Sequence, residues 1–263
     1  MNLEKILTMP YVDFMAFIKE TNRAPWGEMM LLELAKNSFL SSDSSFLHIA
    51  CNTGSSTRLI SDLTKAKGIW IDINKNMVTV ANDFSIRENK KVTHQVMDAQ
   101  NLSFQEQEFD LVFSAWGIAF VPDKKKAIQE MVRVTRNGGF VADIVMYYRQ
   151  TPPDYLIKEM NTLMNINIQK RDKNFWINLY ENQWLKLVYE YEGAYTQVTQ
   201  EKLLWYSRKM SNLMENMSVS EKLLIEYKLY WIMSLFTENH KYLGATLLIF
   251  RKKDSLDQIS LFT

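Results

Sequence analysis

The chain has 263 residues, of which 47% are hydrophobic and 23% are charged, so it is neither a disordered nor a collagen-like chain and can bury one large core. Its 31 Lys and Arg residues nearly balance 30 Asp and Glu residues, which leaves a formal charge of +1. A chain so nearly neutral provides no electrostatic field to hold a polyanion, and we expect no nucleic-acid partner.

Two amphipathic helices are predicted near the start of the chain. Apolar residues recur every three or four positions over residues 11–20 and 28–40. Pro25 and Gly27 break this periodicity in the segment between them. We interpret residues 1–40 as an N-terminal helical cover.

Strands and helices alternate over residues 41–150. Each predicted strand is a short apolar run, and each connection is long enough to contain a helix, which predicts a doubly wound parallel sheet. Residues 41–150 are therefore the expected core. The predicted strands are 46–50, 68–73, 91–99, 109–116 and 139–148, and the predicted helices are 57–66, 74–86 and 125–135.

The alternation ends after Tyr148. Residues 151–240 are interpreted as helical insertions with one strand, which together form a substrate lid. Residues 241–263 are interpreted as the last strand, over 242–250, and a polar tail. We interpret the whole chain as a single domain. The predicted helices of the insertions are 152–165, 181–193 and 218–236, and their predicted strand is 195–207.

The residues that end each strand form one coherent set. Ligands of open α/β sheets bind beyond the carboxyl ends of the strands, so these residues are the candidates for a site. The first strand leads into the loop Ala50–Gly54, whose small residues let backbone N–H groups approach a ligand. The second strand ends at Asp72. This is the position of an acid that accepts hydrogen bonds from ribose hydroxyls. The third and fourth strands end at Asp98-Ala99 and at Ser114-Ala115-Trp116-Gly117.

Five segments together resemble the successive motifs of class I S-adenosylmethionine (SAM) dependent methyltransferases that act on small molecules. They are HIACNTGSSTRLI, WIDINKNMVTVA, VMDAQNLSF, FDLVFSAWGIAFVPD and MVRVTRNGGFVADI, and the resemblance covers residues 45–148. The final YLGATLLIFRKK resembles that family's last strand. The resemblance implies a Rossmann-like, mostly parallel seven-stranded sheet with an antiparallel last strand and helical lid insertions.

The resemblance also implies a cofactor, SAM or its product S-adenosylhomocysteine (SAH), and the residues that hold it. The first loop would bind the methionine moiety, and the acid after the second strand would bind the ribose. By this correspondence Ala50, Asn52 and Gly54 form the loop, Asp72 binds ribose, Ile73 faces adenine, Asp98 and Ala99 meet the adenine edge, and Ala115 and Trp116 lie near the sulfonium and the entry to the substrate pocket.

The first loop departs from the family pattern. It contains one of the three usual glycines, Gly54, and His48 stands where an acid would orient the cofactor's ammonium. Asn52 tolerates a left-handed backbone, and Ala50 adds only a methyl group, so we expect the loop conformation to persist. The departure keeps two alternatives open, which are a non-methylating enzyme such as a cyclase and a non-catalytic binding subunit.

Several residues also have a purely structural interpretation. Asp72 and Asp98 could each cap the helix that follows, and Cys51 could be inert packing. His48, His94 and His240 lack the spacing of metal ligands, so no metal site is expected.

Substrate-binding candidates lie outside the cofactor motifs. Trp176 and Trp205 belong to the insertions, where they either pack helices or face a substrate. Arg23 and Trp26 belong to the connection between the first two helices, where the arginine meets a carboxylate or is solvated. No catalytic residue is identified; Trp116 and His240 are candidates from position and chemistry alone.

The expected activity is methyl transfer to O, N or S of a small, largely apolar or aromatic molecule, in bacterial specialised metabolism. Cys51, the single cysteine, cannot form an intrachain disulfide, and the first residues lack the pattern of a secretion signal, so a cytoplasmic location is expected. The longest apolar stretches are about half of the roughly 20 residues that cross a bilayer, so no membrane segment is expected. The sequence predicts neither the acceptor's identity nor the oligomeric state.

Overall fold

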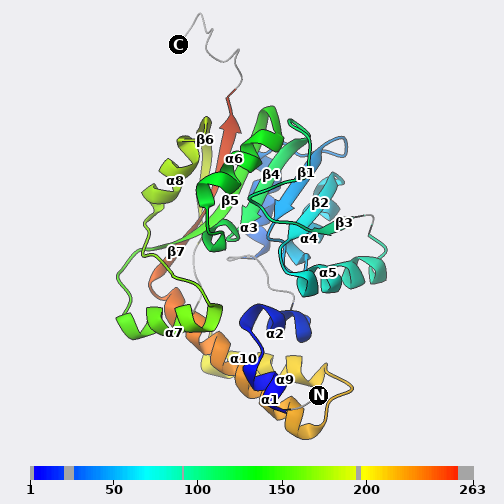
Figure 1. Ribbon diagram of the computed structural model, residues 1–263, viewed down its shortest axis with the longest axis vertical. Helices are drawn as coiled ribbons and strands as arrows, with labels where there is room; N and C mark the ends of the chain where they lie inside the picture. The colour runs from blue at the N-terminus through cyan, green and yellow to red at the C-terminus, as the bar shows by residue number, and fades with distance from the viewer. Residues whose placement is uncertain (1–2, 21–26, 91, 194–196, 254–263) are drawn as a thin grey trace, which may run out of the picture. The chain divides into compact units, whose positions relative to one another are not determined.

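A computed structural model describes residues 3–20, 27–90, 92–193 and 197–253 of the chain (Figure 1). Its strands are β1 (Ser45–Ile49), β2 (Lys67–Asp72), β3 (Thr93–Val96), β4 (Phe109–Ala115), β5 (Thr135–Tyr148), β6 (Leu185–Glu192) and β7 (Leu243–Lys252). Its helices are α1 (Leu3–Thr8), α2 (Tyr11–Phe17), α3 (Glu28–Asn37), α4 (Ser55–Thr64), α5 (Lys75–Arg87), α6 (Lys124–Val134), α7 (Asp154–Met164), α8 (Lys173–Glu181), α9 (Gln200–Asn212) and α10 (Val219–His240), with a short 3₁₀ helix η1 (Ile118–Phe120).

The strands form one sheet in the order β3-β2-β1-β4-β5-β7-β6, which Figure 1 shows edge to edge with β3 and β6 at the two ends. Neighbours from β3 to β5 are parallel, while β6 and β7 are antiparallel. The predicted seven-stranded, Rossmann-like sheet with an antiparallel last strand is confirmed. The strand order reverses between β1 and β4, so the carboxyl ends of these two strands border the crevice where such sheets bind ligands.

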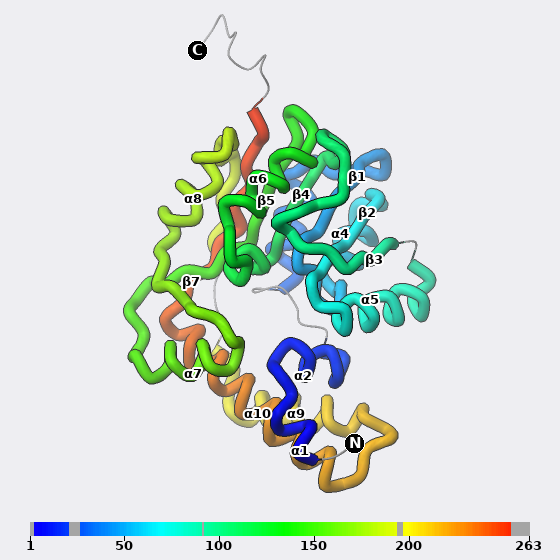
Figure 2. Tube along the Cα trace, viewed as in Figure 1, coloured from blue at the N-terminus to red at the C-terminus, as the bar shows by residue number. Residues whose placement is uncertain are grey.

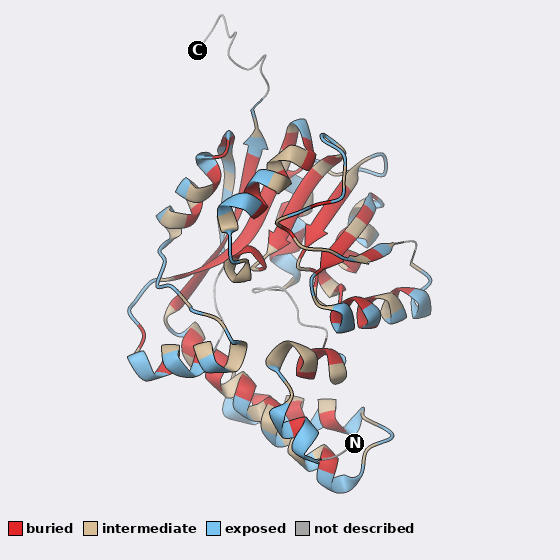
Figure 3. Cartoon of the chain, viewed as in Figure 1, coloured by how far each residue is buried: buried red, intermediate tan, exposed pale blue. Residues whose placement is uncertain are grey.

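The core lies along the sheet, whose central strands β1, β4, β5 and β7 are buried over most of their length (Figure 3). Phe46 of β1 and Phe113 of β4 are fully buried with ring centroids 6.0 Å apart. Trp70 of β2 is also fully buried, and the apolar face of α3 packs on the same cluster through Leu34. Parallel strands buried on both faces require such continuous apolar runs, which is why FLHI and GIWI were recognisable in the sequence.

The chain divides into two compact units. Residues 1–20, 147–170 and 194–244 form one unit, and residues 21–146, 171–193 and 245–263 form the other. We call the first the helical unit and the second the sheet unit. Each unit is assembled from three separate segments of the chain.

A helix cap and long-range hydrogen bonds from a lysine side chain stabilise the helical unit. Its longest helix, α10, begins with a capping box in which Ser218 and Glu221 satisfy each other's backbone N–H groups. Lys228 in the middle of α10 donates to the carbonyls of Ile6 at 2.8 Å and Met9 at 2.7 Å, at the end of α1. Helices α9 and α10 run side by side in this unit (Figure 2).

The predicted helix over residues 181–193 is wrong, because residues 185–192 form the edge strand β6. Side chains along β6 alternate between more and less buried, which is the period of a strand. Tyr189 lies on the inner face, and its hydroxyl donates to Glu33 of α3 at 2.6 Å. The strand expected within the insertions is therefore at 185–192 and belongs to the sheet.

The predicted strand over residues 195–207 is also wrong where the structure describes it. Residues 200–212 form α9, and residues 194–196 lie outside the described residues. The Thr199 side chain accepts the backbone N–H of Lys202 at 3.3 Å and caps this helix. The β-favouring residues Trp205 and Tyr206 are thus placed on a helix, because capping and packing outweigh local propensity.

In the parts of the chain that the structure describes, no helix combines the length and the apolar character needed to cross a membrane.

Candidate functional site

The loop between β1 and α4 has the left-handed backbone that glycines normally supply. Ala50, Asn52 and Gly54 have φ angles of 56°, 50° and 77°. The loop is closed by two backbone bonds, from Cys51 N–H to the Ile71 carbonyl at 3.1 Å and from Gly54 N–H to the Cys51 carbonyl at 2.9 Å. The loop therefore keeps its conformation although two of the three usual glycines are absent, as expected.

Two glycines provide the space in which this loop fits. A Cβ atom at Gly54 would lie 2.8 Å from the Trp70 ring, so only glycine fits there. A Cβ atom at Gly117, after β4, would lie 2.2 Å from the Cβ of Ala50. The methyl group of Ala50 thus occupies the space that Gly117 leaves free, which explains how an alanine replaces a glycine in the first loop.

Asp72 at the end of β2 ties the first loop to the second. Its Oδ2 accepts the backbone N–H of Asn52 at 2.9 Å, and its Oδ1 accepts that of Asn74 at 2.9 Å. The side chain is buried, and this burial raises the pKa of its carboxyl, partly offset by these N–H donors. Each carboxylate oxygen retains lone pairs that ligand hydroxyls can reach.

Asn74, not Asp72, caps the helix that follows. The Asn74 side chain accepts the N–H groups of Asn76 and Met77 at the start of α5. The helix-cap interpretation of Asp72 is therefore wrong. Between the two residues, Ile73 is 70% exposed, and such an exposed apolar residue beside a buried acid offers a surface to a flat ring.

Asp98 follows β3 and begins a tight turn. Its Oδ1 accepts the backbone N–H of Gln100 at 2.8 Å, and the Gln100 amide donates to both carboxylate oxygens at 3.1 Å. Residues 97–108 contain no helix, so the helix-cap interpretation of Asp98 is wrong as well. Ala99 is buried beside it.

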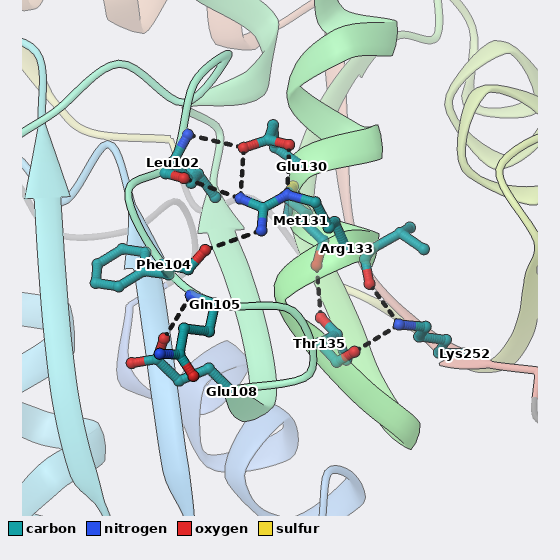
Figure 4. Close-up of polar contacts among 10 residues, drawn as sticks. Leu102, Phe104, Gln105, Glu108, Glu130, Met131, Arg133, Thr135 and Lys252 are labelled. Atoms are coloured by element: carbon teal, nitrogen blue, oxygen red, sulfur yellow. Dashed lines mark hydrogen bonds and ion pairs between the residues drawn. The ribbon is translucent and has the colours of Figure 1, made fainter.

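A polar network from α6 holds the segment after Asp98 (Figure 4). Arg133 donates to the carbonyls of Leu102 and Phe104, each at 2.8 Å. Glu130 accepts the Leu102 N–H at 2.8 Å and pairs with the Arg133 guanidinium at 2.7 Å. Three charge-assisted bonds from α6 thus fix a segment that has no regular structure of its own, and the ion pair between Glu130 and Arg133 holds these two side chains together.

Arg133→Ala should lower the free energy of unfolding by about 1–2 kcal/mol, because the part-buried Glu130 and two carbonyls lose their donor. Urea unfolding would measure this change. The pKa of Glu130 is lowered chiefly by its bond with Arg133, so this stabilisation is present above pH about 4.5 and is lost as the pH falls through the folded-state pKa. An Arg133→Ala chain with unchanged stability at pH 7 would show that the network contributes nothing.

The turn after β4 places Trp116 at the carboxyl end of this strand. Trp116 has a φ angle of 69°, which is rare for a residue with a side chain. Its ring packs edge-to-face on Phe120, with centroids 5.2 Å apart. The Ser114 Oγ accepts the N–H groups of Gly117 at 2.9 Å and Ile118 at 3.3 Å, which closes the turn.

His48 lies inside β1 and is uncharged. It stacks on Phe113 with centroids 4.2 Å apart, and its Nδ1 hydrogen-bonds to Thr57 in the first turn of α4. Burial lowers its pKa to about 3, so the ring is neutral at pH 7. His48 therefore supplies no negative charge to a ligand's ammonium group, as expected, but it fixes the start of α4.

Cys51 is buried in the same loop, and burial together with the Asp72 charge raises the pKa of its thiol well above the usual value. A protonated, buried thiol is a poor nucleophile. This environment favours the packing interpretation of Cys51.

Comparison with known proteins identifies the domain that carries this site. Residues 47–142 match a family model described as a methyltransferase domain. The sheet is shared with the MccD protein, whose crystal structure superposes with a TM-score of 0.73 at 24% identity over 88% of this chain and 100% of that one. Residues 47–142 are a methyltransferase domain of class I fold.

Two further solved structures share the fold of the methyltransferase domain. One is a phosphoethanolamine N-methyltransferase of Haemonchus contortus bound to SAH, with a TM-score of 0.72 and 18% identity over 97% of this chain and 61% of that one. The other is the [4+2]-cyclase SpnF, with a TM-score of 0.68 and 13% identity over 92% of this chain and 93% of that one.

Relatives in sequence match different amounts of the chain. An uncharacterised protein of Haemophilus influenzae is 22% identical over 198 residues, which are 73% of this chain and 78% of that protein. A demethylmenaquinone methyltransferase of Staphylococcus aureus is 36% identical over 98 residues, which are 36% of this chain and 40% of that enzyme. The higher identity thus extends over a shorter stretch of the chain.

The remaining candidates are divided between the two units. Trp176 lies on α8 of the sheet unit and is only 4% exposed, which favours its packing interpretation. Trp205 lies on α9 of the helical unit with 59% of its side chain exposed and Lys209 5.0 Å from its ring. His240 ends α10 of the helical unit, and burial lowers its pKa to about 4. Arg23 and Trp26 lie outside the described residues.

Two residues near the site were not recognised in the sequence. Asp143 of β5 is buried next to the turn that carries Trp116, and the hydroxyl of Tyr180 donates to it at 2.8 Å. A single acid within the otherwise apolar FVADIVM could have revealed it, since a buried charge needs a specific reason. Nothing in the sequence around Tyr180 indicated its partner.

Proposed function

We propose that the chain is a SAM-dependent methyltransferase that transfers a methyl group to O, N or S of a small, largely apolar or aromatic molecule in bacterial specialised metabolism. The observation that carries the proposal is the first loop, which keeps left-handed backbone at Ala50, Asn52 and Gly54 and is bonded to Asp72. A loop of this shape directs backbone N–H groups toward an anionic or polar ligand at the start of α4.

The donor and acceptor set fits SAM. Asp72 offers carboxylate oxygens for two ribose hydroxyls, and Asp98 offers oxygens to an exocyclic amine. Ile73 supplies an exposed apolar face for the adenine ring, and Gly54 leaves the space that a side chain would fill. When bound, SAM would supply an electrophilic methyl group.

The chain's own task is then to orient the acceptor and to exclude water. Methyl transfer from a sulfonium is an in-line displacement that needs alignment more than proton transfer. The absence of an acid–base pair from the proposed residue set agrees with this requirement. Trp116, at the end of β4, is proposed to line the acceptor side, and Ala115 to lie beside the sulfur.

The direct test is tritium transfer from methyl-labelled SAM into a panel of phenols, amines, thiols and carboxylic acids, with tRNA and DNA oligonucleotides as the competing class. We expect labelling of one small-molecule class, since Lys and Arg are balanced by acids. Labelling of nucleic acid with none of any small molecule would contradict the proposed acceptor.

Trp116→Ala should lower turnover by about tenfold and change SAH affinity little, because the side chain is proposed to contact the acceptor and not the cofactor. Turnover is measured with the best acceptor of the panel, and SAH affinity by calorimetry. Phe120→Ala is the control, since it removes the ring that packs on Trp116 while keeping Trp116 itself. Equal losses of turnover and SAH affinity in Trp116→Ala would place Trp116 in the cofactor site.

A non-methylating enzyme on this fold is the second candidate, and the neutral His48 favours it, because the first loop lacks the usual counter-charge. Mass spectrometry of ligands that copurify with the full chain, together with the tritium assay, separates the candidates. SAM or SAH supports either enzyme, whereas consumption of SAM in the tritium assay supports methyl transfer alone. The cytoplasmic location stays a prediction.

A further inference from the structure

Among the described residues, the buried carboxyl group of Asp143 lies next to the turn that carries Trp116. Asp143 lies in β5 directly opposite Ser114 of β4 and is only 1% exposed. The hydroxyl of Tyr180, from α8, donates to its Oδ2 at 2.8 Å. The Tyr180 ring is itself fully buried and stacks on Phe250 of β7 with centroids 4.8 Å apart. The position of the hydroxyl is therefore fixed by packing.

The same carboxyl lies beside the turn, because Asp143 pairs in register with Ser114, whose Oγ closes the turn. The backbone N–H of Trp116 and the hydroxyl of Ser114 both stabilise the charged form of Asp143. The Ser114 oxygen already accepts the N–H groups of Gly117 and Ile118, so its own proton is available to the carboxyl. Asp143 is thus placed to act on the turn through Ser114.

The backbone at Trp116 needs such a restraint. A φ angle of 69° is unfavourable for a tryptophan and persists only where the surroundings hold it. Gly117 restrains the turn from the other side by its close approach to Ala50. The turn is therefore fixed between the first loop and the buried carboxyl.

We propose that Asp143 is a positioning residue that holds the Trp116 turn and thereby positions Trp116 on the acceptor side of the site. The hydrogen bond from the Tyr180 hydroxyl fixes the orientation of the Asp143 carboxyl. The meaning of "acceptor side" rests on the proposed function. The link between the Asp143 carboxyl and the turn does not depend on the proposed function.

The charge of this carboxyl changes near neutral pH. Burial raises the pKa of Asp143 to about 7 against the lowering effect of its hydrogen-bond donors. Among the described residues, the titratable group packed against it is Tyr180 of α8, which burial and the Asp143 charge keep protonated. Ser114 of β4, which lies opposite Asp143, is uncharged, and so is Phe250 of β7, on which the Tyr180 ring stacks. Because a carboxylate accepts hydrogen bonds more strongly than a carboxylic acid, the turn is held more tightly above pH about 7.

The experiment is fluorine NMR of the full chain labelled with 5-fluorotryptophan, with the Trp116 signal assigned from its loss in Trp116→Phe. We expect this signal to titrate with a midpoint near pH 7 in the unsubstituted chain. Asp143→Asn should abolish the titration. Tyr180→Phe removes a donor that lowers the pKa and should move the midpoint upward.

Tyr189→Phe is the matched control, because it removes a tyrosine–carboxylate bond of the same unit at Glu33. It should leave the midpoint unchanged. A Trp116 signal that is independent of pH, or that titrates equally in Asp143→Asn, would overturn the proposal. If Asp143→Asn does not fold, an unmoved midpoint in folded Tyr180→Phe overturns it instead.

Function adds a second readout. Asp143→Asn should lower kcat for methyl transfer at pH 8 while the dissociation constant of SAH changes less than about twofold, which a general loss of stability would not produce. Failure of the unsubstituted chain to bind SAH would reject the proposed function, and the NMR titration would still decide whether Asp143 positions the turn.

Discussion

Asp72→Ala should weaken SAH binding about 10- to 100-fold, which corresponds to about 1.5–3 kcal/mol for hydrogen bonds to a charged group. The carboxyl is expected to bind the ribose hydroxyls, and it also holds Asn52 of the first loop at 2.9 Å. The substitution therefore removes both a ligand contact and the bond that shapes the loop. Calorimetric titration of the full chain with SAH measures the effect.

Two further variants make this result specific. Asp72→Asn keeps one acceptor oxygen and should lose less affinity than Asp72→Ala. Asp83→Asn removes an exposed acid from α5 and should bind SAH as the unsubstituted chain does. Equal affinity of Asp72→Ala and the unsubstituted chain would exclude Asp72 from the site.

Gly117→Ala should destabilise the fold by about 3 kcal/mol, at the upper end of the usual cost of overpacking a buried site. The backbone of Gly117 has φ −71° and ψ −37°, which alanine adopts readily. The cost therefore comes from space alone, since the new Cβ would lie 2.2 Å from that of Ala50. Urea unfolding at neutral pH measures the loss, and SAH binding should be lost with it.

The double variant Ala50→Gly with Gly117→Ala tests this cause. Removing the Ala50 methyl group should restore most of the stability, so the two substitutions should be strongly non-additive. Ala50→Gly alone should be close to neutral, because relief of the left-handed backbone offsets the greater freedom of glycine in the unfolded chain. Additive losses would show that the two loops do not compete for the same space.

The sequence predicted the sheet and its ligand-binding edge because both depend on short-range patterns. Runs such as FLHI and GIWI are buried on both faces, Asp72 is the last residue of β2, and Asp98 lies two residues after β3. The sequence predicted that the first loop keeps its conformation without two of its glycines. The sequence did not reveal where the methyl group of Ala50 would fit. Ala50 and Gly117 are far apart in the chain, and only the neighbouring position of β1 and β4 brings them together.

The errors lie where two periodicities compete. Leu185, Leu187 and Tyr189 alternate as in a strand, but the preceding Trp184 and the neighbouring Val188 also complete a helical spacing. The strand wins because β7 offers it a partner, and that partner is about 60 residues further along the chain. The pairing of Asp143 with Tyr180 was unpredictable for the same reason, since it depends on α8 packing beside β5.

The strand order also bears on how the protein is made. β7 follows β5 and β6 in the chain but lies between them in the sheet. A nascent chain that has reached residue 240 contains both of these strands but not the one that joins them, so their facing edges have no partner yet. Until β7 has been synthesised the sheet can grow only as far as β5, and the free edge of β5 is a site that chaperones can protect.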